Sequence, residues 1–201
     1  MQDKKTLFSD IDYHITQDEA PSQYLRQKMR EGAFREKPWS IFVRMEKTDQ
    51  DPDYHPEGNV FEHTMMVVDQ AALRRHESIN PRAFMWGALL HDIGKPDTTM
   101  PRKGRLTAYN HDIRGGEMVK DFFAELTEDK ELVKQVTALV RWHMQALFVK
   151  KHAKLEEMRK DIDYREIALL TYCDRMGRTG VDIEREKANI DEFVKRVTIQ
   201  L

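Results

Sequence analysis

A histidine-aspartate pair, His91-Asp92, stands at the end of an apolar run, between Leu89-Leu90 and Gly94. The carboxyl end of a helix carries a partial negative charge and free carbonyl groups, so a cation is favoured there. A neutral imidazole and a carboxylate in such a last turn can both bind one ion. The dipeptide alone does not identify a metal site, because a second His-Asp pair occurs at 111–112.

Three further ligand candidates lie on or beside apolar segments. His63 and His143 interrupt otherwise apolar stretches, and Asp174 follows the apolar run 167–172. A buried polar side chain without a partner costs about 2–7 kcal/mol, so each of these groups needs one. We therefore expect these three groups and the His91-Asp92 pair to converge from four separate helices, which is how helical bundles build metal sites.

Apolar residues at helical spacing predict an all-α fold. In the segment 60–72 they recur every three or four positions, which is typical of one face of a helix. Asn80-Pro81 predicts the start of the next helix, which Gly94 and Pro96 are expected to end. Residues 97–109 are expected to form a basic loop. Further helices are expected at about 113–126, from a cap at Thr127 through Leu147, and from Asp182 onward. Asp163 and Glu166 resemble a capping box, which predicts a helix from Asp163 to about Asp174.

The chain length of 201 residues suits one domain with a hydrophobic core. Before residue 53, short helical pieces are expected, broken at Pro21, Gly32 and Pro38. We expect a single domain in which these pieces pack as an N-terminal extension, at 1–53, on a metal-binding core at 54–180. A C-terminal helix follows at 181–201.

The composition excludes several classes of function. A net charge of −2 gives no global attraction to nucleic acid or anionic lipid. Cys173 is the only cysteine, which excludes an intrachain disulfide and a CxxC pair. The sequence has no signal-peptide pattern and no apolar run approaching about 18 residues, so we expect a cytoplasmic protein without a membrane partner. RNA stays a possible partner through the basic stretches 102–105 and 150–154, although the net charge does not support it.

The ligand candidates resemble the H…HD…D pattern of the HD superfamily of metal-dependent phosphohydrolases. Three segments, HPEGNVFEHT at 55–64, ALLHDIGKP at 88–96 and DRMGRTG at 174–180, are similar in particular to the HD domain of CCA-adding tRNA nucleotidyltransferases. Those enzymes also carry an N-terminal polymerase domain with a glycine-rich motif and paired aspartates. Here Asp10-Ile11-Asp12 is the only candidate pair, and the fifty residues available cannot build that domain. Without that domain nucleotide addition is not expected, and hydrolysis by the HD domain is the activity that the resemblance leaves.

The resemblance implies a set of metal ligands: His63, His91, Asp92 and Asp174. Mixed histidine and carboxylate ligands suit a divalent transition metal (Mn, Fe, Co, Ni or Zn) better than Mg. His111 and His143 match the additional histidines of two-metal members, in which Asp92 bridges the two ions. One ion is thus expected and the second stays open, because His111 also suits a helix N-terminus and His143 also suits a hydrogen-bonded core position.

The resemblance also assigns catalytic and substrate-binding roles. Asp92 and Lys95 are the expected catalytic residues, because a divalent cation lowers the pKa of water toward ~7 and a lysine ammonium can stabilise the phosphate. Alternatively, the Lys95 ammonium only interacts with the partial negative charge at the carboxyl end of the helix. Arg175 and Arg178 can bind phosphate bidentately, or can form salt bridges.

The expected function is hydrolysis of a phosphomonoester or phosphodiester of nucleotide type, as a 2′,3′-cyclic phosphodiesterase, nucleotidase or phosphatase. The first substrates to try are 2′,3′-cyclic nucleotides, 2′-nucleotides and RNA ends. Two alternatives stay open. Di-iron oxygenases of the same superfamily use four histidines and two aspartates, and a non-catalytic nucleotide- or RNA-binding module could retain the metal site. The sequence does not specify the oligomeric state.

Overall fold

The computed structural model describes residues 3–147 and 152–199, and helices dominate this part of the chain. This confirms the prediction of an all-α fold; Lys150 and Lys151 of the basic stretch lie outside the described residues. The helices are α1 (Lys4–Gln17), α2 (Pro21–Arg30), α3 (Ser40–Glu46), α4 (Val60–Arg74), α5 (Pro81–Leu90), α6 (Lys95–Thr98), α7 (His111–Phe123), α8 (Lys130–Trp142), α9 (His152–Asp161), α10 (Tyr164–Met176) and α11 (Ile183–Ile199).

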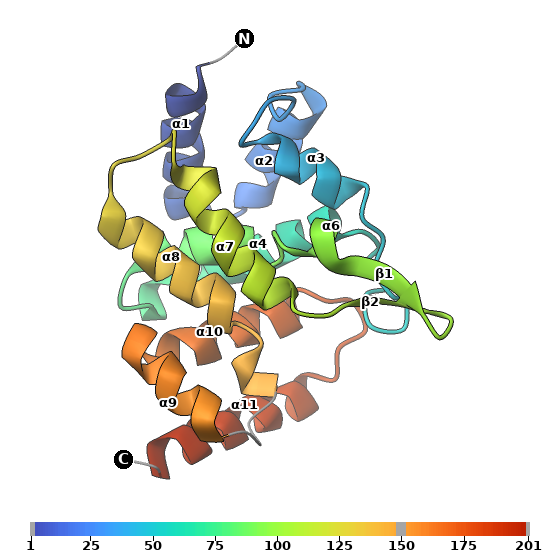
Figure 1. Cartoon of the computed structure of the whole chain (residues 1–201), viewed down its shortest axis with the longest axis vertical. Helices are drawn as coiled ribbons and strands as arrows, with labels where there is room; N and C mark the ends of the chain where they lie inside the picture. Colours follow the sequence, from blue (N-terminus) through green and yellow to red (C-terminus); the bar gives the residue numbers. More distant parts are fainter. Residues whose placement is uncertain (1–2, 148–151, 200–201) are drawn as a thin grey trace.

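Helix α5 forms the centre of the core. Every residue from Ala83 to Leu90 is buried, as expected of a helix that is apolar on all sides. The helices α4, α8 and α10 all pack against it. Helix α7 lies beside α8 (Figure 1). The predicted ligands therefore lie at the end of α5, on helices that pack against α5, or on α7, which packs against α8.

The N-terminal helices cover one end of this core, opposite α9 and α11 (Figure 1). Helix α1 packs on α5, where the Asp12 carboxylate accepts hydrogen bonds from Arg82 Nε at 2.9 Å and Trp86 Nε1 at 2.7 Å. Helix α2 packs on α4, where Ser22 Oγ donates to Asp69 Oδ2 at 2.6 Å. Within the described residues, no helix combines the length and apolar character needed to cross a membrane.

The residues after α5 make a tight turn instead of continuing the helix to Gly94. Helix α5 ends at Leu90, and the turn 91–94 leads into α6, where Pro96 occupies the first turn. The turn lies directly against the start of α7. A Cβ added at Gly94 would lie 2.2 Å from the His111 carbonyl oxygen and 2.7 Å from the Gly115 nitrogen. Only glycine therefore allows the His-Asp turn and α7 to approach so closely.

The prediction of a loop at 97–109 was wrong, because this segment contains a β-hairpin. Strand β1 (Thr99–Arg102) pairs antiparallel with β2 (Arg105–Ala108), and Arg102 lies opposite Arg105. The two turn residues, Lys103 and Gly104, have φ angles of 49° and 78°, the left-handed backbone of a type I′ turn. Strands of four residues, one of them interrupted by a proline, are too short to show an alternating pattern.

Two predicted helix starts differ from the structure. Helix α7 begins at His111 rather than 113, after Asn110 in the left-handed conformation. Helix α8 begins at Lys130, because Asp129 rather than Thr127 is the cap: its carboxylate accepts from Leu132 N at 3.0 Å. The predicted cap at Asp163 is confirmed.

The carboxylate three residues after that cap, Glu166, does not close a capping box. It turns away from the helix end and accepts hydrogen bonds from Ser78 Oγ at 2.7 Å and Ile79 N at 2.9 Å. Glu166 thereby fastens α10 to the segment before α5. This contact fixes α10, which carries Asp174, relative to α5, which precedes His91.

Candidate metal centre

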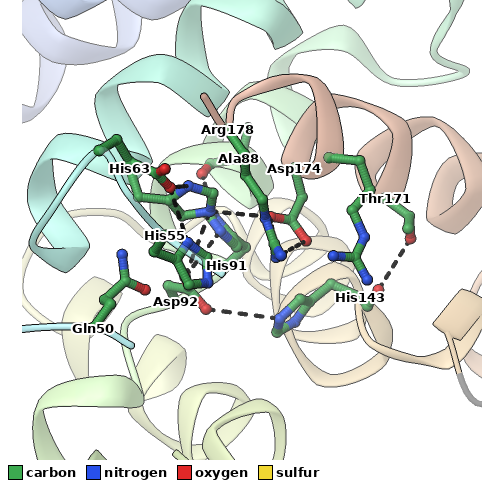
Figure 2. A network of polar contacts seen from close by, with 12 residues as sticks. Gln50, His55, His63, Ala88, His91, Asp92, His143, Thr171, Asp174 and Arg178 are labelled. Carbon is green, nitrogen blue, oxygen red and sulfur yellow. Dashed lines mark hydrogen bonds and ion pairs between the residues drawn. The ribbon is translucent and has the colours of Figure 1, made fainter. Parts of the chain in front are cut away.

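The structure brings together the side chains that the sequence predicts as metal ligands: His63, His91, Asp92, His111, His143 and Asp174. They come from the first turn of α4, the turn after α5, the first residue of α7, the end of α8 and the last turns of α10. All are buried, with His111 the most accessible at 7%. The close view shows His63, His91, Asp92 and Asp174 pointing toward one another (Figure 2).

One group of ligand atoms lies between α4, α5 and α10. His63 Nε2 lies 3.0 Å from Asp174 Oδ1, and the ligand atoms of His63, His91 and Asp174 all lie within 4.8 Å of one another. His91 Nε2 is buried and, among the described residues, has no hydrogen-bond partner. An orphaned nitrogen beside two carboxylates is what a metal site leaves when its ligands face a common centre.

A second group lies between α5, α7 and α8. The ligand atoms of Asp92, His111 and His143 lie within 4.8 Å of one another, and Asp92 Oδ1 is 3.3 Å from His111 Nε2. The other oxygen, Asp92 Oδ2, lies 3.2 Å from His91 Nε2 and 3.9 Å from His63 Nε2. Asp92 thus faces both groups, one oxygen to each, as a bridging ligand would.

The Nδ1 atoms of the four histidines all face oxygen acceptors. The pairs are His63 with Glu57 Oε1 at 2.9 Å, His91 with Ala88 O at 2.8 Å, His111 with Ala108 O at 2.6 Å, and His143 with Val140 O at 2.7 Å. These contacts assign the proton to Nδ1 and leave the Nε2 lone pair for a ligand.

The same tautomers bring two lone pairs against each other. His111 Nε2 and His143 Nε2 are 3.2 Å apart, although each ring has its Nδ1 proton committed to a carbonyl. Two acceptors at this distance repel unless a proton or a cation lies between or beside them. The donor set therefore fits a divalent cation, which would satisfy both nitrogens at once.

Glu57 is a site residue that the sequence patterns did not single out. Its Oε1 accepts from both His55 Nδ1 and His63 Nδ1, each at 2.9 Å, and only 3% of its side chain is exposed. Burial by itself raises the pKa of Glu57, but the hydrogen bonds from the two histidines outweigh it and hold the pKa well below its ordinary value. A carboxylate that orients a ligating histidine is a regular part of metal sites. In the sequence, Glu57 is marked only as an acidic residue in the turn before α4.

Two carboxylates and one histidine of the cluster have pKa values that suit a cation. Burial alone would raise the pKa values of Asp92 and Asp174, but His91 and Lys95 beside Asp92, and Arg178 and His63 beside Asp174, hold both well below the ordinary value. Burial lowers the pKa of His143 to about 4. At neutral pH the carboxylates are therefore ionised and His143 is neutral, the forms that bind metals.

The predicted phosphate-binding side chains differ in their contacts. Lys95 Nζ lies 2.7 Å from Asp92 Oδ2 and donates to Gln50 Oε1 at 2.7 Å. Arg178 Nη2 donates to Asp174 Oδ1 at 3.2 Å. Arg175 Nε lies 3.3 Å from Glu186 Oε2 of α11, without hydrogen-bond geometry in the described part of the chain.

A cavity of about 570 Å³ opens onto the cluster. Asp92, His111, His143 and Asp174 form part of its wall, and Lys95, Arg175 and Arg178 add positive charge to the same wall. This volume is in the range of small-ligand sites, about 300–1,000 Å³. An anionic ligand in the cavity would contact the cluster and the cationic side chains together.

Comparison with known proteins matches the model of the HD domain family to residues 60–176, a span that contains all of these histidine and aspartate ligand candidates. The chain is 28% identical over 145 residues to the Multifunctional CCA protein of Paracidovorax citrulli, covering 66% of this chain and 32% of that protein. The Multifunctional CCA protein of Mannheimia succiniciproducens is 30% identical over 143 residues, covering 64% of this chain and 33% of that protein. That of Actinobacillus pleuropneumoniae serotype 5b is 24% identical over 173 residues, covering 80% and 41%. The chain thus spans about a third of the length of the first two relatives.

Proposed function

We propose that this chain, which belongs to the HD domain family of metal-dependent phosphohydrolases, hydrolyses phosphate esters of nucleotide type. The observation that supports the proposal most directly is a set of buried, mutually facing ligand atoms beside a cavity with a cationic wall. Asp92, one of the proposed metal ligands, lines that cavity, and Lys95, Arg175 and Arg178 give its wall positive charge.

The residues that would hold the first ion are His63, His91, Asp92 and Asp174, and those that would hold a second are Asp92, His111 and His143. A divalent cation supplies a Lewis acid there, which lowers the pKa of water and neutralises charge on a phosphate. The mixed nitrogen and oxygen ligands favour Mn, Fe, Co, Ni or Zn. Glu57 contributes by keeping the His63 ring in one orientation and one tautomer.

The chain's own cations bind and orient the phosphate. Lys95 is 9% exposed and lies at the cavity wall, 2.7 Å from Asp92 Oδ2. Its ammonium can therefore turn from Asp92 to a phosphate oxygen and stabilise the charge that develops there during hydrolysis. Arg178 and Arg175 can bind the remaining oxygens, and their planar guanidinium groups fix the direction in which the ester enters.

The nucleotide character of the substrate is proposed from similarity. The relatives bear the name Multifunctional CCA protein, and the three segments at 55–64, 88–96 and 174–180 resemble the HD domain of CCA-adding enzymes. The substrates proposed first are 2′,3′-cyclic nucleotides, 2′-nucleotides and the ends of RNA. The cavity is large enough for a mononucleotide.

A matched pair of aspartate variants tests this proposal. The purified chain, loaded in turn with Mn, Fe, Co, Ni or Zn, is assayed against cyclic and linear nucleotides. We expect turnover with at least one metal, and a loss of at least about 100-fold in Asp92→Asn. Asp112→Asn is the control, because Asp112 is the acid of the other His-Asp dipeptide but pairs with Arg141 at 3.1 Å. Equal activity of the wild type and Asp92→Asn on every substrate would reject the hydrolase.

The same preparations separate the two alternative functions. Oxygen uptake by the iron-loaded chain on small polyols or phosphonates, without phosphate release from nucleotides, would indicate a di-iron oxygenase. Nucleotide binding without turnover under every metal would indicate a non-catalytic module. The cationic wall of Lys95, Arg175 and Arg178 favours the phosphohydrolase over the oxygenase.

A further inference from the structure

Exposed apolar side chains gather at one edge of the molecule. Eight large apolar side chains are exposed within the described residues, and four of these lie on or next to the hairpin: Tyr54, Met100, Tyr109 and Ile113. Tyr54 and Tyr109 are 56% and 64% exposed. Exposed apolar side chains that lie together on a surface often mark a ligand-binding site.

Each of these tyrosines lies against an arginine of the hairpin. The Arg102 guanidinium carbon is 4.6 Å from the centroid of the Tyr109 ring. The Arg105 guanidinium carbon is 6.0 Å from the Tyr54 centroid, and Arg105 Nη1 donates to the Tyr54 hydroxyl at 3.4 Å. Because Arg102 and Arg105 pair across the type I′ turn, the hairpin holds both guanidinium groups in place.

The two rings line the catalytic cavity. Tyr54 and Tyr109 belong to the wall of the same cavity of about 570 Å³ that reaches Asp92 and Lys95. Leu106 of β2 supplies an apolar surface between the hairpin and the cluster. One ligand in this cavity can therefore place a phosphate at Lys95 and a flat apolar group at the aromatic edge.

We propose that Tyr54 and Tyr109 form a base-binding rim, at which an unpaired nucleobase of the substrate stacks while its phosphate lies at the metal centre. This inference rests on the proposed phosphohydrolase function and adds the part of the substrate that is recognised. Every base has an aromatic face, so such stacking is strong and tolerant of sequence. The arginines behind the rings add positive charge near the sugar-phosphate backbone. The rim selects nucleotides over phosphate esters that lack a base.

Paired substrates test the rim on the manganese-loaded chain. A nucleotide that is turned over is compared with the ribose phosphate that carries the same ester and no base. In Tyr109→Ala and Tyr54→Ala we expect KM for the nucleotide to rise about 5- to 100-fold, with kcat/KM for the ribose phosphate unchanged. Tyr109→Phe keeps the ring and should restore the wild-type KM. Tyr13→Ala is the control, because Tyr13 is 62% exposed on α1 and outside this cavity.

A binding measurement keeps this test independent of catalysis. Calorimetric titration with adenosine monophosphate on the metal-free chain should give a Kd that rises in Tyr109→Ala and Tyr54→Ala but not in Tyr13→Ala. That result supports the rim even if no substrate is hydrolysed, in which case only the proposed hydrolase fails. Equal Kd values in all variants, or an equal loss on the nucleotide and the base-free ester, would overturn the rim while leaving hydrolysis intact.

Discussion

Hydrogen bonds donated by the Nδ1 atoms decide what the four histidines of the cluster can bind. Three of these bonds go to backbone carbonyls three residues earlier, as in His91 to Ala88 and His143 to Val140. Nearby backbone carbonyls thus fix the tautomers of these three histidines, without help from another side chain. His63 is the exception. It is the fourth residue of α4, where the Asn59 carbonyl already accepts from His63 N at 3.2 Å, and its Nδ1 faces Glu57 instead. Its orientation is therefore the one that depends on a side chain outside its own helix.

The variant Glu57→Gln tests this dependence. Because the amide is a weaker acceptor for the two histidine Nδ1 protons, we expect metal affinity to fall about 10- to 100-fold while the fold is retained. Metal titration with circular dichroism measures both quantities. Glu62→Gln is the matched control, because Glu62 pairs with Arg26 at 2.6 Å and its side chain is 39% exposed. Equal affinities in the two variants would show that Glu57 does not position His63.

At the scale of elements, short contacts between helices bring the ligands together. The Thr171 hydroxyl of α10 donates to the His143 carbonyl at 3.0 Å, which joins the ends of α8 and α10 (Figure 2). Gly94 allows the start of α7 to lie against the turn that carries Asp92. These contacts set the separation of the two ligand groups. A shift of one helix would therefore change the distance from Asp92 to His111.

Gly94→Ala should disturb this packing specifically. Its Cβ would lie 2.2 Å from the His111 carbonyl oxygen, and backbone must move to accommodate it. We expect a loss of about 1–3 kcal/mol in the free energy of unfolding, together with weaker metal binding. Gly116→Ala on α7 is the comparison, because the nearest contact of its Cβ would be Arg141 Cβ at 3.2 Å. Denaturant unfolding of both variants measures the difference; a loss no larger in Gly94→Ala than in Gly116→Ala would contradict the close approach.

Helix positions and ligand candidates could be predicted from the sequence, whereas contacts between elements could not. The cap at Asn80 accepts a hydrogen bond from Ala83 N at 3.2 Å, as a local rule predicts. The hairpin at 99–108 was missed because its strands are too short for a periodic signal, and the tyrosine rim was missed with it. Glu57 and Glu166 act through partners remote along the chain or in another element, for which the local sequence carries no pattern.

At the scale of the whole molecule, the cluster joins segments that are far apart along the chain. His63 and Asp174 contact each other across 111 residues, and His111 contacts His143 across 32. A cation bound there would cross-link α4, α7, α8 and α10 around the central helix. Without a cation, the negative charges of Asp92 and Asp174 are only partly neutralised, and the facing lone pairs of His111 and His143 repel each other. The core is therefore expected to be less stable without metal.

Metal should raise the thermal stability of the chain. At a free metal concentration about 100 times Kd, binding adds about 2.7 kcal/mol. For a chain of this size that corresponds to a rise in Tm of about 5–10 °C. Calorimetry before and after addition of a chelator measures the change. In Asp92→Asn the metal-dependent shift should be much smaller; a wild-type Tm that does not respond to any of the five metals would oppose a site in the core.

The six buried side chains are expected to surround a metal ion. Anomalous diffraction from crystals grown with zinc locates that ion. We expect an anomalous peak about 2.0–2.2 Å from His91 Nε2 and from a carboxylate oxygen of Asp92 or Asp174. Zinc bound only elsewhere on the molecule, with His91 Nε2 far from any peak, would show that these side chains do not form a metal site.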